Sequence, residues 1–176
     1  MTDFESGAVL SQDLRHRYLL RRSIEPNSSL FGSSLCEAAL RAEKVLFVML
    51  NPSTADAFED DMTIRKCRTF AAMWGASWLT VVNVFSFRAT NPDALCRVSD
   101  PWNQTGDQYV QAEIAGHKNG IIVAAWGRHA MVKDRKWIPA AIGQHGGWCL
   151  GVNQDGSPKH PLYVPYAQPL VPYARL

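Results

Sequence analysis

No apolar stretch in the 176 residues approaches the roughly 20 residues that a membrane-spanning helix requires. The first ten residues, MTDFESGAVL, also lack the basic start and the apolar core of a secretory signal. We therefore expect a cytoplasmic protein that has no membrane partner.

Closely spaced cysteine pairs are absent as well, because the 4 cysteines are widely scattered. Neither a zinc knuckle nor a clustered iron–sulfur site is indicated, and the 5 histidines show no zinc-site spacing. The glycines form neither a dinucleotide fingerprint nor a P-loop, and no spacing supports a serine or cysteine nucleophile paired with a histidine. The sequence therefore demands no metal or redox cofactor.

The chain has little excess charge of either sign, since 18 basic and 16 acidic side chains leave a net charge of +2. Overall charge therefore does not indicate nucleic acid, and local patches must decide. A hydrophobic content of 47% fits one compact domain over residues 1–176. We divide it into an N-terminal extension (1–44), in which RHRYLLRRSI can add an edge strand, a βα core (45–152), and a proline-rich loop and tail (153–176).

Apolar runs alternate with helical patterns through the core. Runs without polar alternation are typical of parallel strands covered on both faces, and they occupy residues 44–50, 78–85, 121–126 and 147–152. Helices are predicted between them, over residues 62–74, 104–120 and 128–143. The sequence predicts an α/β fold, a three-layer sandwich around a mostly parallel, four-stranded central sheet.

Helix ends are also marked in the sequence. Asn91-Pro92 is typical of a cap followed by the first helical residue, and Asn119-Gly120 is a good C-terminal stop. Pro139 interrupts the third helical pattern.

Polar and otherwise unusual residues follow each predicted strand. The first strand leads into Asn51-Pro52-Ser53-Thr54-Ala55-Asp56, the second ends on Asn83, the third leads into Trp126-Gly127-Arg128-His129, and the fourth leads into GSPKHPLY (156–163). In open α/β sheets, ligands bind beyond the carboxyl ends of the strands. We therefore expect these segments to converge on a binding site.

These segments carry two resemblances. Over nearly the whole chain, MLNPSTADA, DDMTIRKC, NVFSFRATNP, AAWGRH and GSPKHPLY resemble the bacterial and phage family of domain of unknown function 1643. The order of the motifs is also similar, more remotely, to the uracil-DNA glycosylase superfamily, with Asn51-Pro52, Asn83, Trp126-Gly127 and His160-Pro161 at the matching places. The chain departs from that superfamily at Met49, where a glycine is usual, and at Leu162, where a serine is usual.

The superfamily resemblance implies roles that fit the chemistry of each residue. Asn51 or Asp56 would organise a water, Asn83 would read a flipped base, and His160 would donate a hydrogen bond to the base oxygen that gains charge as the glycosidic bond breaks. Each residue also has a structural alternative. The side chain of Asn51 can hydrogen-bond the backbone of its own turn, Asn83 can hydrogen-bond a neighbouring loop, and His160 can be a surface histidine without a role. Asp60 and Asp61 are further acid candidates, although acids at that position also cap a helix.

Ser53 bears on the choice of base. Uracil-specific members of the superfamily have a tyrosine after this proline, and it excludes bases that carry a group at carbon 5. The smaller Ser53 implies a pocket that admits a 5-substituted pyrimidine, such as a modified base of phage DNA, in preference to uracil.

Contacts with DNA are assigned to the converging loops. Arg88 and Lys159 are the preferred cations, Ser157 can bind phosphate through its backbone, and Phe58 is a stacking candidate. Pro52 and Trp126 complete the predicted substrate-binding set. The first core helix offers Arg65, Lys66 and Arg68 as further contacts, although a solvated helix face explains these three equally well. Arg128 and the segment RHRYLLRR are also available for contact with nucleic acid.

The leading hypothesis is a DNA glycosylase-like enzyme that flips and excises a modified base, with DNA as its partner and defence against phage as a conceivable setting. One alternative is a hydrolase or transferase of free nucleosides or nucleotides. A second is a non-catalytic reader of modified nucleic acid. The third is a small-molecule enzyme of unrelated chemistry on the same scaffold.

Overall fold

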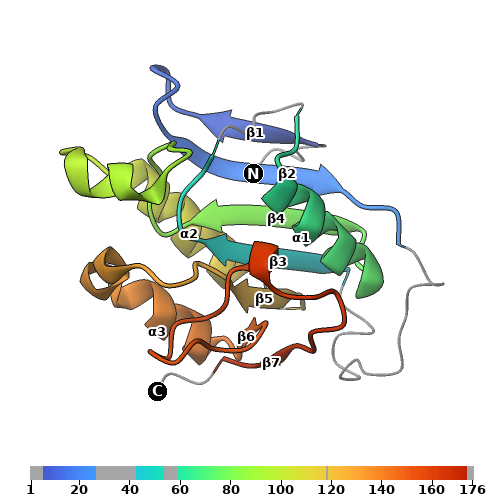
Figure 1. Cartoon of the computed structure of the whole chain (residues 1–176). Helices are drawn as coiled ribbons and strands as arrows, with labels where there is room; N and C mark the ends of the chain where they lie inside the picture. The colour runs from blue at the N-terminus through green and yellow to red at the C-terminus, as the bar shows by residue number, and fades with distance from the viewer. Residues whose placement is uncertain (1–5, 27–42, 54–58, 118, 174–176) are drawn as a thin grey trace.

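The computed structural model describes residues 6–26, 43–53, 59–117 and 119–173, and its centre is a seven-stranded sheet (Figure 1). The strand order is β1-β2-β4-β3-β5-β6-β7. The strands are β1 (Gly7–Leu10), β2 (Arg17–Ser23), β3 (Lys44–Met49), β4 (Trp78–Asn83), β5 (Ile121–Ala124), β6 (Trp148–Cys149) and β7 (Val171–Pro172).

The four predicted core strands lie side by side and parallel, in the order β4-β3-β5-β6. The predicted α/β class is confirmed, but the sheet is larger than expected and mixed. The N-terminal run folds into an antiparallel hairpin of β1 and β2, and the proline-rich tail adds β7 antiparallel to β6. The run RHRYLLRRSI therefore forms a strand, but β1 lies outside it and takes the edge.

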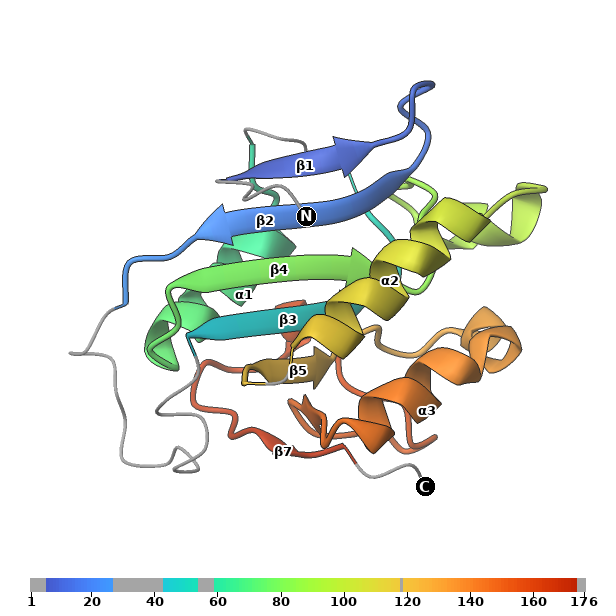
Figure 2. The same ribbon diagram turned by 180° about the vertical axis from the view of Figure 1, so that it is seen from behind.

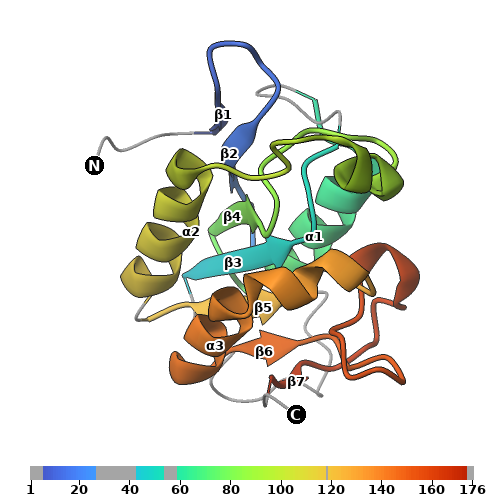
Figure 3. The same ribbon diagram turned by 90° about the vertical axis from the view of Figure 1, so that its left-hand side faces the viewer.

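Helices cover both faces of the sheet (Figure 2). Because side chains alternate along a strand, Val45, Phe47 and Met49 of β3 pack toward helix α1 (Met62–Met73). Leu46 and Val48 pack with helices α2 (Gln104–Gly116) and α3 (Trp137–Gln144) on the opposite face. Figure 3 shows α1 and α2 on opposite sides of the strands. This arrangement explains why the core strands lack polar alternation.

Two predicted helices differ from the structure for local reasons. Helix α2 ends at Gly116, with His117 as its cap, and not at Asn119-Gly120. A Cβ on Gly120 would lie 2.4 Å from Cδ2 of His117, so the glycine permits close packing on the ring after the helix has ended. The third helical pattern breaks before Pro139: residues Ala130–Arg135 form a 3-10 helix (η4), and Pro139 lies in the first turn of α3, where a backbone N–H is not needed.

The connections create a crevice at one edge of the sheet. The connection that follows β3 leads to β4, on one side of β3. The connection that follows β5 leads to β6, in the opposite direction across the sheet. The connections at the carboxyl ends of β3 and β5 therefore diverge, which is the usual place for a ligand site in an open α/β sheet. Two further 3-10 helices, η3 (Pro92–Arg97) and η5 (Pro161–Tyr163), follow β4 and β6.

The C-terminal segment is fixed against α1. The ammonium of Lys66 donates a hydrogen bond of 3.0 Å to the carbonyl of Leu162 in η5 and lies over the ring of Tyr166. Within the described ranges, no helix combines the length and apolar character needed to cross a membrane.

Candidate active site

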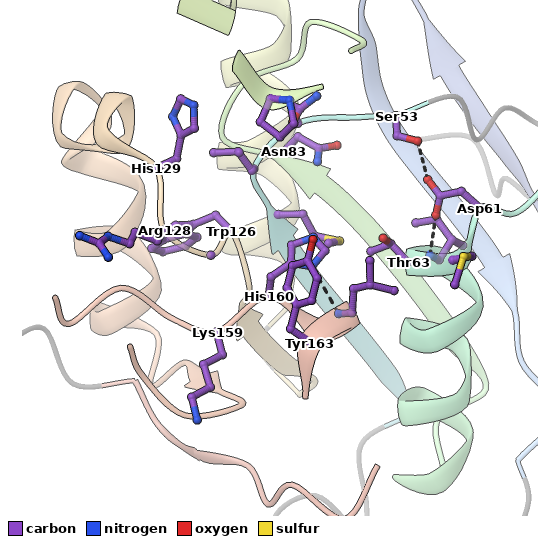
Figure 4. Close-up of a pocket in the computed structure, with 18 of the residues that line it drawn as sticks. Ser53, Asp61, Thr63, Asn83, Trp126, Arg128, His129, Lys159, His160 and Tyr163 are labelled. Atoms are coloured by element: carbon purple, nitrogen blue, oxygen red, sulfur yellow. Dashed lines mark hydrogen bonds between the residues drawn. The ribbon is translucent and has the colours of Figure 1, made fainter. Parts of the chain in front are cut away.

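A cavity of about 810 Å³ lies at the carboxyl edge of the sheet, at the divergence of β3 and β5 (Figure 4). Its walls come from the ends of β3 and β4, the loop after β5, the first turn of α1, and the segment around η5. Predicted site residues from four separate segments line it together, namely Asn51, Ser53, Asn83, Trp126, Lys159 and His160. Segments far apart in the sequence therefore meet at one place.

Asn83 is the last residue of β4 and is only 5% exposed. Its Oδ1 is buried and accepts no hydrogen bond from the described part of the chain. An unpaired buried acceptor costs about 1–3 kcal/mol. Because Asn83 lines the cavity, a ligand that donates a hydrogen bond would remove this cost.

His160 lies across the cavity, just before η5. Its Nδ1 accepts a hydrogen bond of 3.3 Å from the backbone N–H of Leu162, which leaves the ring proton on Nε2. Burial lowers the pKa of His160 to about 4, and the nearby charge of Asp61 only partly opposes this effect. At neutral pH, the ring is therefore a neutral N–H donor.

Gly127 lets the loop after β5 approach this histidine. Its φ of +73° is unfavourable for other residues, and a Cβ there would lie 3.2 Å from Cβ of His160. The Trp126-Gly127 pair thus has a structural purpose: Trp126 is 3% exposed and packs edge-on against Tyr173, and Gly127 makes room for His160.

Asp61 supplies a carboxylate to the cavity wall from the start of α1. Its Oδ1 accepts a 2.8 Å hydrogen bond from the N–H of Ile64, so the predicted capping role is present. Its Oδ2 accepts a 2.8 Å hydrogen bond from Oγ of Ser53. Ser53 is therefore turned toward this acid in the wall of the cavity (Figure 4).

Asn51 connects two loops. Its Nδ2 donates to the carbonyls of Pro52, at 3.0 Å, and Ala89, at 2.8 Å. Its amide donors are thus used by the backbone, and Oδ1 is the group that it can offer to a ligand. Pro52, in the loop after β3, is buried and is not among the residues that line the cavity.

Two other predicted contacts, Arg88 and Ser157, lie outside the main cavity. Arg88 donates 3.1 Å to the carbonyl of Leu14 and lines a smaller neighbouring pocket. Ser157 donates 2.6 Å to Asp155 and is not among the residues that line the main cavity. The exposed Arg128 does line it and pairs with Asp155 at 3.1 Å. Asp56 and Phe58 lie outside the described residues.

The basic residues at the start of α1 are held largely by Asp60. The carboxylate of Asp60 pairs with Arg22 and Arg68, each at 2.8 Å, and its backbone carbonyl accepts from Nε of Arg65. Burial raises the pKa of Asp60, but hydrogen bonds from Arg68 and Arg22 outweigh it, so the pKa is lowered overall. These bonds hold the residue that precedes the cap of α1 against β2 and against the first two turns of the helix.

Sequence reasoning did not single out Arg17, the first residue of β2. It lines the cavity although it is only 2% exposed. Burial lowers its pKa to about 10, against the opposing charge of Asp61. The available signal was a basic residue at the start of the largely apolar run RYLL, which forms the first half of β2.

A serine–histidine–aspartate arrangement also occurs, outside the cavity. Nδ1 of His16 lies 2.9 Å from Oγ of Ser86, and Nε2 lies 3.5 Å from Oδ2 of Asp100. However, Ser86 is 4% exposed, and its Oγ would lie 2.9 Å from a Cβ on Gly106. Since a substrate carbonyl cannot reach this hydroxyl, the cluster fastens the N-terminal hairpin to the loop after β4.

The described residues contain no group of three or more histidine, cysteine or acidic side chains arranged to hold a metal ion. Comparison with family models matches residues 17–162 to the protein family of unknown function DUF1643. The chain belongs to this family. The DUF1643 match begins at Arg17 and includes His160, so it spans most of the cavity wall. No curated protein and no solved structure matches the chain.

Proposed function

We propose that this DUF1643 protein is a DNA glycosylase-like hydrolase that takes a modified, 5-substituted pyrimidine base of DNA into the cavity and hydrolyses its N-glycosidic bond. The observation that carries the proposal is the buried, unpaired Oδ1 of Asn83 in the cavity wall. The Watson–Crick edge of a flipped base presents adjacent donors and acceptors that an asparagine amide can match.

The neutral His160 supports the choice of reaction. When the bond between C1′ of the sugar and the base nitrogen breaks, the electron pair stays with the base, and negative charge develops on its carbonyl oxygen. The Nε2–H of His160 would donate to this oxygen without carrying a positive charge of its own. Removing one such donor typically lowers the rate about 10²–10³-fold.

The convergence of the motifs supports a relation to the uracil-DNA glycosylase superfamily. The three residues that carry that resemblance at the strand ends, Asn51, Asn83 and Trp126, line one cavity together with His160. The four parallel strands that deliver them form the centre of a three-layer arrangement. Oδ1 of Asn51 would accept a hydrogen bond from the attacking water in this scheme.

Free nucleotides are a second candidate substrate, because the buried Arg17 is among the residues that line the cavity. Arginine is well suited to bind phosphate, and a free nucleotide could bring its phosphate into the cavity. Steep salt dependence of binding to oligonucleotides would favour DNA. Tight binding of mononucleotides with little dependence on length would favour this second candidate.

The choice of base can be tested by release of base from oligonucleotides that differ at one position: uracil, thymine or 5-hydroxymethyluracil. We expect faster release of the 5-substituted bases, and we expect Ser53→Tyr to reverse the order because its ring would fill the wall. Ser99→Tyr is the matched control, since Ser99 is exposed and outside the cavity. A preference of the wild-type protein for uracil would contradict the proposed specificity.

A further inference from the structure

Hydrolysis of an N-glycosidic bond needs a group that takes a proton from water, and Asn51 cannot do so because an amide is not an effective base. Asp61 is the carboxylate among the described residues that line the cavity. Figure 4 shows it at the start of α1, on the same side of the cavity as Ser53.

Two hydrogen bonds fix the orientation of this carboxylate. One oxygen accepts from the backbone of Ile64, and the other accepts from the hydroxyl of Ser53, each at 2.8 Å. A carboxylate oxygen has two lone-pair sites, so each oxygen keeps the capacity to accept from one more donor. The capping role and a role toward a water are therefore compatible.

The charge of Asp61 acts on two other residues that line the cavity, His160 and Arg17. It favours the protonated form of His160 against burial, and it does the same for Arg17. Both effects require the carboxylate to lie within a short electrostatic distance of these side chains. Asp61 therefore contributes a negative charge to the same cavity wall that His160 and the buried Arg17 line.

We propose that Asp61 is the general base of the reaction, an inference that rests on the proposed function. Asp61 takes a proton from water, the water oxygen bonds to C1′ of the sugar, and the bond from C1′ to the base nitrogen breaks. The base leaves with the electron pair, stabilised by His160, and afterwards takes up a proton. Ser53 acts as a positioning residue, because its hydroxyl holds one carboxylate oxygen.

The decisive variant is Asp61→Asn. Asparagine caps helices as well as aspartate does: its Oδ1 can still accept from the N–H of Ile64, and its Nδ2 can donate to Oγ of Ser53, so α1 should stay intact. We expect single-turnover base release to fall about 10²–10⁴-fold, with oligonucleotide affinity and melting temperature close to those of the wild type. Asp93→Asn is the matched control, because Asp93 is an exposed carboxylate in the first turn of η3, outside the cavity.

Chemical rescue separates a proton acceptor from a structural residue. In Asp61→Ala, added formate should restore part of the base release, since a small carboxylate can occupy the vacated space, whereas chloride at the same ionic strength should not. A parallel Asp56→Asn variant tests the rival acid from the sequence.

Two outcomes would overturn the proposal while leaving the proposed function in place: full activity in Asp61→Asn, or a larger loss in Asp56→Asn than in Asp61→Asn. Base release that is absent in the wild-type protein itself would overturn the proposed function and, with it, this inference.

Discussion

One histidine lies at each end of the parallel strands, and the two histidines differ in what surrounds them. Burial lowers the pKa of both His117 and His160 to about 4. His117 lies at the amino edge, bonded to the backbone of Lys44 and packed against Gly120. His160 lies at the carboxyl edge and lines a cavity of about 810 Å³. A neutral buried imidazole is thus compatible with packing alone, and only His160 lines a cavity where the proposed chemical role is possible.

The largest expected effect separates these two histidines by activity. His160→Gln should lower base release about 10²–10³-fold, because the donor to the leaving base is displaced. His117→Gln should leave the rate of release unchanged, since its ring is far from the strand ends that form the cavity. Single-turnover release on a modified oligonucleotide measures both variants, and equal losses in the two would remove the distinction between the edges.

The next effect is the shared response of both histidines to pH. Because their folded pKa values lie near 4 and the unfolded value is 6.5, the unfolded chain binds more protons between these limits. Their contribution to stability is complete above pH 6.5 and is lost as the pH falls toward 4. We expect about 3 kcal/mol from the buried His117 and less from the half-buried His160.

Denaturant unfolding at several pH values between 4 and 7 measures this slope. Each glutamine variant should flatten the dependence of the free energy of unfolding on pH, and the double variant should flatten it further. A slope that neither variant changes would assign the acid sensitivity to other groups.

The smallest expected effect has an unusual sign and concerns Asn83. Asn83→Leu removes a buried acceptor that has no partner among the described residues, so the free energy of unfolding should rise by about 1 kcal/mol while binding of the modified oligonucleotide is lost. Thermal melting measures the change in stability, and fluorescence anisotropy measures binding of the modified oligonucleotide. Lower stability with unchanged binding would mean that Asn83 serves the fold and not a ligand.

Much of this architecture could be predicted from the sequence, because the core strands carry a strong local signal. Apolar runs such as KVLFVM are buried on both faces, and their alternation with helices predicts parallel strands whose carboxyl ends converge. The outer strands could not be predicted in this way. Strands β6 and β7 have two residues each, and β7 contains Pro172, so pairing with neighbours defines them rather than local pattern.

Part of the candidate site could also be predicted from the sequence. Asn83 stood out as a polar residue inside the apolar run VVNVF, and His160 stood out through the His160-Pro161 pair of the superfamily resemblance; both line the cavity. The role that we propose for Asp61 depends on a hydrogen bond to Ser53, eight positions away, which no periodicity indicates. Arg17 depends on the hairpin of β1 and β2, whose register the sequence does not specify.

The most direct test is release of free base from a panel of genomic DNAs, some unmodified and some phage-derived with 5-substituted pyrimidines, with free base scored by mass spectrometry and abasic sites by alkaline cleavage. The account predicts release from the modified DNAs by the wild-type protein, loss of release in His160→Gln, and retention in His117→Gln. No release from any DNA by the folded wild-type protein would contradict glycosylase chemistry.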